Sequence, residues 1–150
     1  MTSIASPATL DGLVARLQRV ERTSSRLWGK MNAHEMLCHL ADSFLTMMGE
    51  RQISSAETWM SQHVIKFIAI HTPLPWPKGI PTRPEVNPHD KGTRPAVFDR
   101  DRDTVIALMR RFASPEARYA RHPMFGAMTR SEWLTWGFRH VDHHLRQFGL

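Results

Sequence analysis

The stretch TRSEWLTWGFRHVDHHLRQF, residues 129–148, predicts how the chain ends and where its chemistry lies. Thr129 followed by Glu132 is a capping-box pattern, in which each side chain accepts a hydrogen bond from the other residue's backbone N–H. This pattern predicts a helix from Arg130 to about Gln147. The helix contains three histidines within five residues, which points to a metal site, a catalytic base or a polar helix face.

Helical geometry separates these three histidines. At about 100° per residue, His140 and His144 lie roughly 40° apart on one side of the helix. Their sector is the apolar one, which also holds Trp133, Gly137, Val141, Leu145 and Phe148. His143 points away from it, toward Arg139 and Arg146, and is better placed to contact an anionic ligand or solvent. The phase therefore predicts that His140 and His144 act together and that His143 does not.

Two further helices are predicted in the first third of the chain. Apolar spacing predicts one within residues 8–25, ending in a serine-rich turn. Asn32 and Glu35 form a second capping box. The helix that they begin should run to about Met48, where Gly49 can close it.

The middle of the chain adds two more helical segments. One should begin at Ser54 or Ser55 and stop at a proline-rich segment, and the other should cover about 101–113 with Asp99 or Asp101 as its cap. No credible pair of strands remains. The sequence therefore predicts one all-α domain over residues 1–150, built as a helical bundle.

Seven of the ten prolines lie in the segment 72–95. Proline removes a backbone donor and breaks helices, so we expect this segment to be irregular. Long irregular segments inside compact domains often form lids or pocket walls. We therefore expect the segment to lie over or beside a site.

Charge and composition narrow the classes of partner. The net charge of +6 raises nucleic acid as a partner. The basic residues, however, are mostly single arginines interleaved with acids and apolar residues, as on solvated helix faces, so a small anionic substrate is the better expectation. No secretory pattern and no run of about 18 apolar residues is found. The single cysteine, Cys38, agrees with a cytoplasmic location.

A third histidine is placed to join the other two. In NAHEMLCHLADSF, His39 lies at the edge of the apolar stripe of its helix. Two imidazoles at i and i+4 make a weak metal site, whereas three leave an open position on the ion, as in catalytic zinc sites. The competing interpretation is that a backbone carbonyl or a carboxylate satisfies each buried histidine and that the HxxxH spacing arose by chance.

Several other residues are candidates with two interpretations each. His122 is a candidate catalytic acid or base at the mouth of the site, or else it orders its turn. Trp76 covers a pocket or packs its loop down. Asp42 and Glu35 are candidate acceptors for a ligand N–H, or a fourth ligand. Cys38 points away from His39 and is expected to be a packed small residue.

The remaining histidines and one glycine complete these expectations. His63, His71 and His89 are expected to be structural or exposed. Gly137 weakens its helix by about 1 kcal/mol relative to alanine. We therefore expect it to leave room for a bound molecule or for a close neighbouring helix.

Two motifs carry a resemblance to a known superfamily. They are W-x(10)-H-L, from Trp28 to Leu40, and H-x-x-x-H-x-x-Q, which ends at Gln147. With the longer stretches LWGKMNAHEMLCHLADSF and HPMFGAMTRSEWLTWGFRHVDHHLRQF, they resemble the DinB-like superfamily, within it an uncharacterised bacterial branch. The similarity runs from about residue 26 to the end of the chain.

The resemblance implies a fold and a ligand set. Members are four-helix bundles in which one histidine of the second helix and two of the last bind a divalent metal. Carried over, these are His39, His140 and His144, with zinc as the expected metal and nickel or iron as alternatives. The DinB-like bundle would here carry an extra helix and the long proline-rich loop 72–95.

The resemblance also implies a chemistry. Characterised relatives include thiol-dependent S-transferases and a maleylpyruvate isomerase, which use a low-molecular-weight thiol such as mycothiol or bacillithiol. We therefore expect a metal-dependent enzyme acting on a small electrophile, with His122 and His143 as catalytic candidates and Arg139 and Arg146 as candidates for binding the cosubstrate. The alternative is a non-catalytic metal-binding or homodimerising protein.

Overall fold

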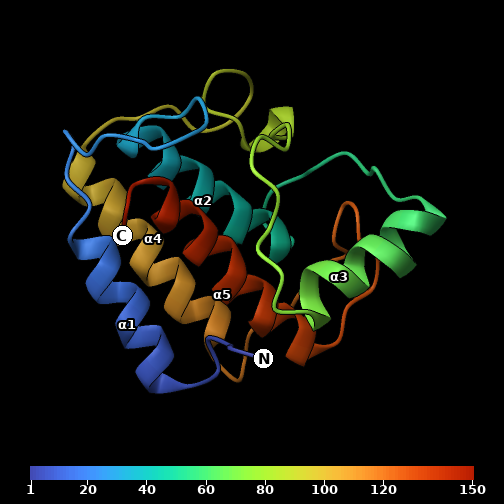
Figure 1. Cartoon of the computed structure of the whole chain (residues 1–150). Coiled ribbons are helices and arrows are strands. Elements are labelled where there is room, and N and C mark those ends of the chain that lie inside the picture. Colours follow the sequence, from blue (N-terminus) through green and yellow to red (C-terminus); the bar gives the residue numbers. More distant parts are fainter.

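The computed structural model describes all 150 residues and is built from helices (Figure 1). The five α-helices are α1 (Pro7–Gln18), α2 (Ala33–Met47), α3 (Lys66–His71), α4 (Phe98–Ala113) and α5 (Arg130–Gln147). A π-helical stretch, Ser61–Ile65, runs directly into α3, and a single 3-10 turn spans Pro84–Val86. No strand is formed, so the predicted all-α class is confirmed. None of the helices has the length and apolar composition that crossing a membrane requires.

Four of the helices enclose the core. α2 packs against α4, and α1 packs against α4 and α5, while α3 lies apart on one side of this group (Figure 1). Aromatic residues fill the middle: the ring of Phe44 lies 5.1 Å from that of Phe112 and 6.3 Å from that of Trp136. The contact between Phe44 and Trp136 joins α2 to α5, so these two helices meet through large side chains.

Both predicted capping boxes are present. At the start of α2, Glu35 N–H donates to Asn32 Oδ1 over 2.9 Å, and Asn32 N–H donates to Glu35 Oε2 over 2.8 Å. At the start of α5, Thr129 N–H donates to Glu132 Oε2 over 2.7 Å. These local bonds fix where the two helices begin, and hence the phase of their histidines.

Three predicted helix limits are wrong, because other hydrogen bonds compete with the α-helical pattern there. α1 stops at Gln18, short of residue 25, because Val20 N–H donates to Leu17 C=O in a tighter turn and Ser24 Oγ accepts from Glu21 N–H. These bonds replace the α-helical pattern.

The third helical run begins at residue 59, later than Ser54 or Ser55. Ser54 instead bonds the carboxylate of Glu85, which keeps this stretch extended. The actual start is capped by Thr58 and Ser61, each of which accepts the other's backbone N–H.

Helix α4 begins at Phe98, earlier than predicted, and neither aspartate is its cap. Asp99 and Asp101 lie in the first turn, where the negative charge of a carboxylate interacts favourably with the positive end of the helix dipole. Asp101 accepts from Ala96 N–H over 3.0 Å, so it closes the turn that leads into the helix.

Segment 72–95 is irregular, as predicted, apart from the short turn at 84–86. It is attached to the helices at several points. Near its end, the buried carboxylate of Asp42 on α2 accepts from Thr93 N–H over 2.6 Å and from Arg51 Nη1 over 2.8 Å. Val86, in its middle, is itself buried. The segment therefore has a defined course along α2.

Candidate metal centre

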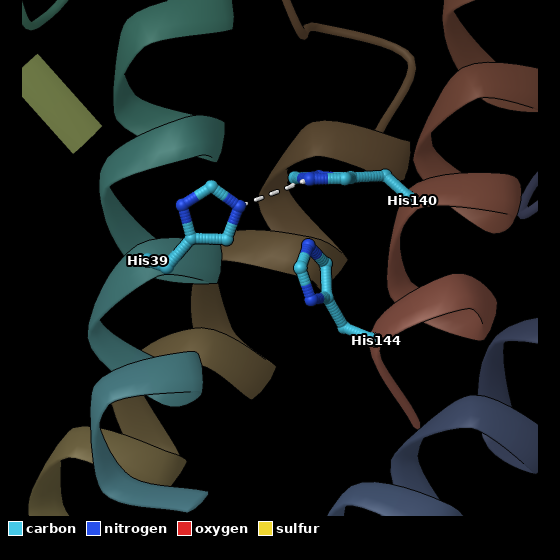
Figure 2. Close-up of side chains that lie close together, drawn as sticks. All are labelled: His39, His140 and His144. Carbon is cyan, nitrogen blue, oxygen red and sulfur yellow. Dashed lines mark hydrogen bonds between the residues drawn. The ribbon is translucent and has the colours of Figure 1, made fainter. Parts of the chain in front are cut away.

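Three histidines from two helices converge in the interior. His39 on α2 faces His140 and His144 on α5, and the three rings point toward one another (Figure 2). The Nε2 atoms of His39 and His140 are 3.3 Å apart, and one nitrogen from each ring lies within 4.8 Å of the others. Zinc–nitrogen bonds of 2.0–2.1 Å in a tetrahedral site place two ligand nitrogens about 3.3–3.4 Å apart. The spacing of His39 and His140 fits one ion between them.

Hydrogen bonds fix the tautomers of two of the rings. His39 Nδ1 lies 2.8 Å from the carbonyl oxygen of Val86, and His144 Nδ1 lies 3.1 Å from Gln147 Oε1. Both oxygens only accept, so both Nδ1 atoms carry the hydrogen. The Nε2 lone pairs of His39 and His144 are therefore free to bind a metal, as in histidine-ligated sites whose ring orientation is set by such bonds.

The partner of His144 is itself held in place. Gln147 Nε2 donates to the carbonyl of Trp28 over 2.8 Å. The side-chain amide of Gln147 thus links the Trp28 carbonyl to His144 by two hydrogen bonds. Gly29 permits this approach, because a Cβ at position 29 would lie 2.1 Å from Gln147 Nε2.

His140 is oriented by packing. Its ring centroid lies 4.7 Å from that of Trp136 and 6.1 Å from that of Trp76. Its Nδ1 is buried and has no hydrogen-bond partner. The aromatic walls therefore fix the ring, and its Nε2 is the nitrogen that faces His39.

All three imidazoles are held in the neutral form that metal ligation requires. Burial lowers the pKa of His39, and it lowers the pKa of His140 and His144 well below the usual value. The neighbouring imidazoles lower the latter two further, because two protonated rings in contact would repel each other. The lone pairs are available at neutral pH without loss of a proton.

Two predicted partners of the site are wrong. Asp42 is occupied by Thr93 and Arg51, and Glu35 by the capping box and by His89 at 3.3 Å. Neither carboxylate bonds a histidine of the cluster. Because other donors occupy both carboxylates, the Val86 carbonyl and the Gln147 amide, which were not predicted, bond the histidines instead.

His143 lies outside the cluster, as the helix phase predicted. Its half-buried ring lies 6.0 Å from those of Trp28 and Trp76. Two adjoining pockets of about 410 and 260 Å³ share His143, Arg146, Pro75 and Trp76 in their walls. We call this combined space the Trp76 pocket.

Segment 72–95 forms one wall of the Trp76 pocket, as expected. Trp76 has both predicted roles, since its Nε1 donates to Ala69 C=O over 3.0 Å and its ring borders both the pocket and His140. Arg139 is a pocket residue, but its guanidinium donates to the carbonyls of Thr72 and Leu74. Arg139 therefore anchors the wall, which leaves Arg146 as the freer of the two candidate arginines.

Cations dominate the Trp76 pocket. Lys78 lines it, with Nζ 4.4 Å from the centroid of the Trp28 ring. Arg146 also lines it and pairs with Asp142 over 2.7 Å, and Asp142 pairs in turn with Arg16 over 2.8 Å. The single carboxylate is shared between two arginines, so the pocket favours an anionic ligand.

Comparison of the sequence with models of protein families places the chain in one of them. A family model described as "Protein of unknown function (DUF1569)" matches residues 6–149. The chain belongs to the DUF1569 family. No curated protein and no solved structure matches it.

In this DUF1569 chain, His122 is part of a turn. Its Nδ1 accepts from the backbone N–H of Met124 and Phe125 over 3.2 and 3.1 Å, and its ring stacks on Phe125 with centroids 4.3 Å apart. These contacts match the turn-ordering interpretation of His122. No contact places it among the three convergent histidines.

The burial of His122 predicts a pH dependence of stability. Burial lowers its pKa to about 3, below the value of about 6.5 expected in the unfolded chain. Between these values the unfolded state binds a proton that the folded state does not. The contribution of His122 to the free energy of unfolding is therefore fully present above about pH 6.5. It is lost as the pH drops toward 3, by about 2 kcal/mol between pH 7 and pH 5.

His122→Asn isolates this contribution, since Asn Oδ1 can accept the same backbone N–H groups. Urea unfolding with a chelator present, at pH 7 and pH 5, should show that wild type loses about 2 kcal/mol more than the variant over this interval. Equal losses in the two proteins would mean that His122 is solvated and titrates normally.

The sequence analysis did not predict a second group of residues that are of metal-ligand types. His34, Cys38 and Asp101 lie together between α2 and α4. His34 Nε2 bonds Asp101 Oδ2 over 2.7 Å, and burial raises the pKa of the Cys38 thiol to about 12. The thiol thus stays protonated and the carboxylate is already paired, which does not favour metal binding by this group. The bond between His34 and Asp101 instead joins α2 to α4. Cys38 is packed, as predicted, and the i, i+4 spacing of His34 and Cys38 was the available signal.

Gly137 makes room for the side chains of Ile4 and Phe112. A Cβ there would lie 2.7 Å from Ile4 Cδ1 and 3.1 Å from Phe112 Cε1. Of the two predicted alternatives, a close neighbouring helix is confirmed and space for a bound molecule is not found, because α4 and the N-terminal segment pack against the glycine. The histidines expected to be structural or exposed are so: His63 bonds Trp59 C=O and His71 bonds Glu132.

Proposed function

We propose that this DUF1569 chain is a DinB-like four-helix bundle, formed by α1, α2, α4 and α5, that binds one divalent metal ion, zinc, through His39, His140 and His144. The observation that carries the proposal is the convergence of three neutral imidazoles, two of them with Nδ1 bonded so that Nε2 faces the centre. Three nitrogen ligands are the set found in catalytic zinc sites, which keep a further position open.

The proposed reaction is transfer of a low-molecular-weight thiol to a small electrophile, or a thiol-dependent isomerisation. A bound divalent ion would supply Lewis acidity that lowers the pKa of the thiol. The sulfur then loses its proton and bonds to an electrophilic carbon, which either releases a leaving group with its bonding electron pair or, in a double bond conjugated to a carbonyl, passes the π electron pair to that carbonyl. His143 can accept that proton, because burial lowers its pKa and keeps it neutral at pH 7.

The residues around the centre support this chemistry in two ways. Trp76 and Trp136 cover the ring of His140, which keeps water from that side of the site. The Trp76 pocket offers Arg146 and Lys78 to an anionic group of the thiol or of the electrophile. The substrate is thus proposed to be a small anion held beside the histidines.

Cobalt substitution tests the proposal. Protein without a histidine tag, stripped by a chelator and loaded with cobalt, should bind one ion per chain and show the visible bands of a tetrahedral site. Adding a thiol such as cysteine should add a sulfur-to-cobalt charge-transfer band. Binding of cobalt with no response to any thiol would favour the alternative, a non-catalytic metal-binding protein, and no cobalt binding would contradict both.

A further inference from the structure

The helical run over residues 59–71 has its polar side turned inward. Ser61 is buried and its hydroxyl donates to Met124 C=O over 2.6 Å. Lys66 Nζ donates to Ala127 C=O over 2.9 Å and pairs with Glu132 over 3.0 Å. The polar residues of the run therefore attach it to the rest of the chain, and Figure 1 shows α3 standing at the side of the molecule.

Most large apolar side chains of the same run are turned outward, although Ile70 is buried in the core. Trp59 is 70% exposed and Phe67 is 60% exposed. Of the eleven large apolar side chains that are exposed in the protein, six lie on this run and a seventh follows it. We call these seven the α3 face: Trp59, Met60, Val64, Ile65, Phe67, Ile68 and Leu74.

The α3 face is a large apolar patch for a monomer. Aromatic side chains offer about 150–250 Å² each and aliphatic ones less, so the exposed fractions of these seven, from 40% to 70%, correspond to several hundred Å² of apolar surface. The largest apolar patch on a typical monomer is about 300–600 Å² and is often an interaction site. A stable interface of standard size buries about 800 Å² on each partner, of which only part is apolar. The face can thus supply the apolar part of such an interface.

The charges of the run argue against a membrane or a nucleic acid as the partner. Residues 59–71 contain no acid, and their one lysine or arginine, Lys66, is paired with Glu132. Helices that lie on membranes carry several lysines and arginines on the polar face, and nucleic acids are bound through such cations. His63 and His71 stack on Trp59 and Phe67, with ring centroids 5.0 and 5.6 Å apart.

We propose that the α3 face binds the α3 face of a second copy of this chain, in a two-fold symmetric dimer. Two uncharged faces meet without like-charge repulsion, and two-fold dimers that use the same patch twice are the commonest protein assemblies. In an antiparallel pair, Val64 and Ile65 at the middle of the run meet their own copies. Trp59 meets the half of the partner's run that holds Phe67.

The dimer also reaches the pocket wall. Leu74 belongs to the α3 face, and its carbonyl accepts from Arg139 of the Trp76 pocket. Association of two chains therefore braces segment 72–95 from outside. The inference stands on the surface of the run alone and is independent of metal binding.

Sedimentation equilibrium tests the proposal. The wild-type protein should have twice the chain mass of 17.3 kDa at micromolar concentration. Trp59→Glu and Phe67→Glu should halve the mass, while circular dichroism shows unchanged helix content because both residues are exposed. Leu27→Glu is the matched control: Leu27 is 69% exposed and lies outside the α3 face, so this variant should stay dimeric.

Cross-linking tests the position of the two-fold axis. Val64→Cys should form a disulfide-linked dimer when diamide is added, whereas Leu27→Cys should not; Cys38 is buried and cannot compete. A monomeric wild type, a dimer that survives Phe67→Glu, or equal cross-linking of the two cysteine variants would each overturn the proposal. Binding of a monomeric wild type to phosphatidylcholine vesicles would overturn it too and assign the face to a membrane.

Discussion

His140→Ala should lower the zinc affinity of the protein by about 100-fold or more. The substitution reduces three convergent nitrogens to two, and the loss of a ligand should exceed the 10- to 100-fold effect typical of residues that only orient ligands. Competition with a chromogenic zinc chelator measures the affinity directly. His39→Ala and His144→Ala should show losses of the same order, because all three nitrogens belong to one group.

His143→Ala is the matched control for this result. His143 is adjacent to His144 in sequence, but it lines the Trp76 pocket and lies outside the convergent group. Its removal should leave zinc affinity within a few-fold of wild type and should weaken the binding of an anionic ligand. Loss of zinc in His143→Ala, with retention in His140→Ala, would show that the assigned ligands are wrong.

Gly29→Ala should destabilise the protein and weaken its metal binding together. The residue has φ +84°, and its new Cβ would lie 2.1 Å from Gln147 Nε2. A left-handed alanine costs about 1–2 kcal/mol. The amide must also move, which breaks its bonds to Trp28 and His144 and leaves buried groups unpaired at about 1–3 kcal/mol. We expect about 2–5 kcal/mol less stability and a 10- to 100-fold lower zinc affinity.

Gly49→Ala separates the cost of a left-handed backbone from the cost of displacing the Gln147 amide. Gly49 has φ +79°, and a Cβ there would meet only Ala120 Cβ at an ordinary 3.6 Å. Urea unfolding should show a loss of about 1–2 kcal/mol from the left-handed backbone alone, with zinc affinity unchanged. If Gly29→Ala had the same small effect and kept its zinc affinity, the Gln147 amide would not be orienting His144.

Local sequence patterns determined the helices whose limits matter most for the site. The capping boxes at Asn32 and Thr129 act over three residues, so their partners are always within reach and the prediction needs no tertiary knowledge. Helix phase then determined that His140 and His144 share a side and that His143 does not. The facing position of His39 followed from its place on an apolar stripe that had to be buried.

Other limits were wrong where a remote group decided them. Ser54 has good capping chemistry, but Glu85, thirty-one residues away, takes its hydroxyl and backbone N–H. The sequence of 59–71 predicts only a helical segment, whereas the structure turns Ser61, Lys66 and Ile70 inward and leaves six large apolar side chains exposed. Attachment to Met124 and Glu132 fixes that orientation.

The environment of the histidines was likewise decided by the tertiary structure. Asp42 and Glu35 were the natural sequence candidates for orienting a ligand, yet Val86 C=O and the Gln147 amide do so. A backbone carbonyl has no signature in the sequence, because every residue carries one and only the course of segment 72–95 brings this one to His39. The sequence by itself thus determined which histidines converge, through short-range helix geometry. Only the packing of distant segments decided which nitrogen of His39 and His144 faces the centre, because a tautomer depends on whichever acceptor the fold brings within hydrogen-bond distance.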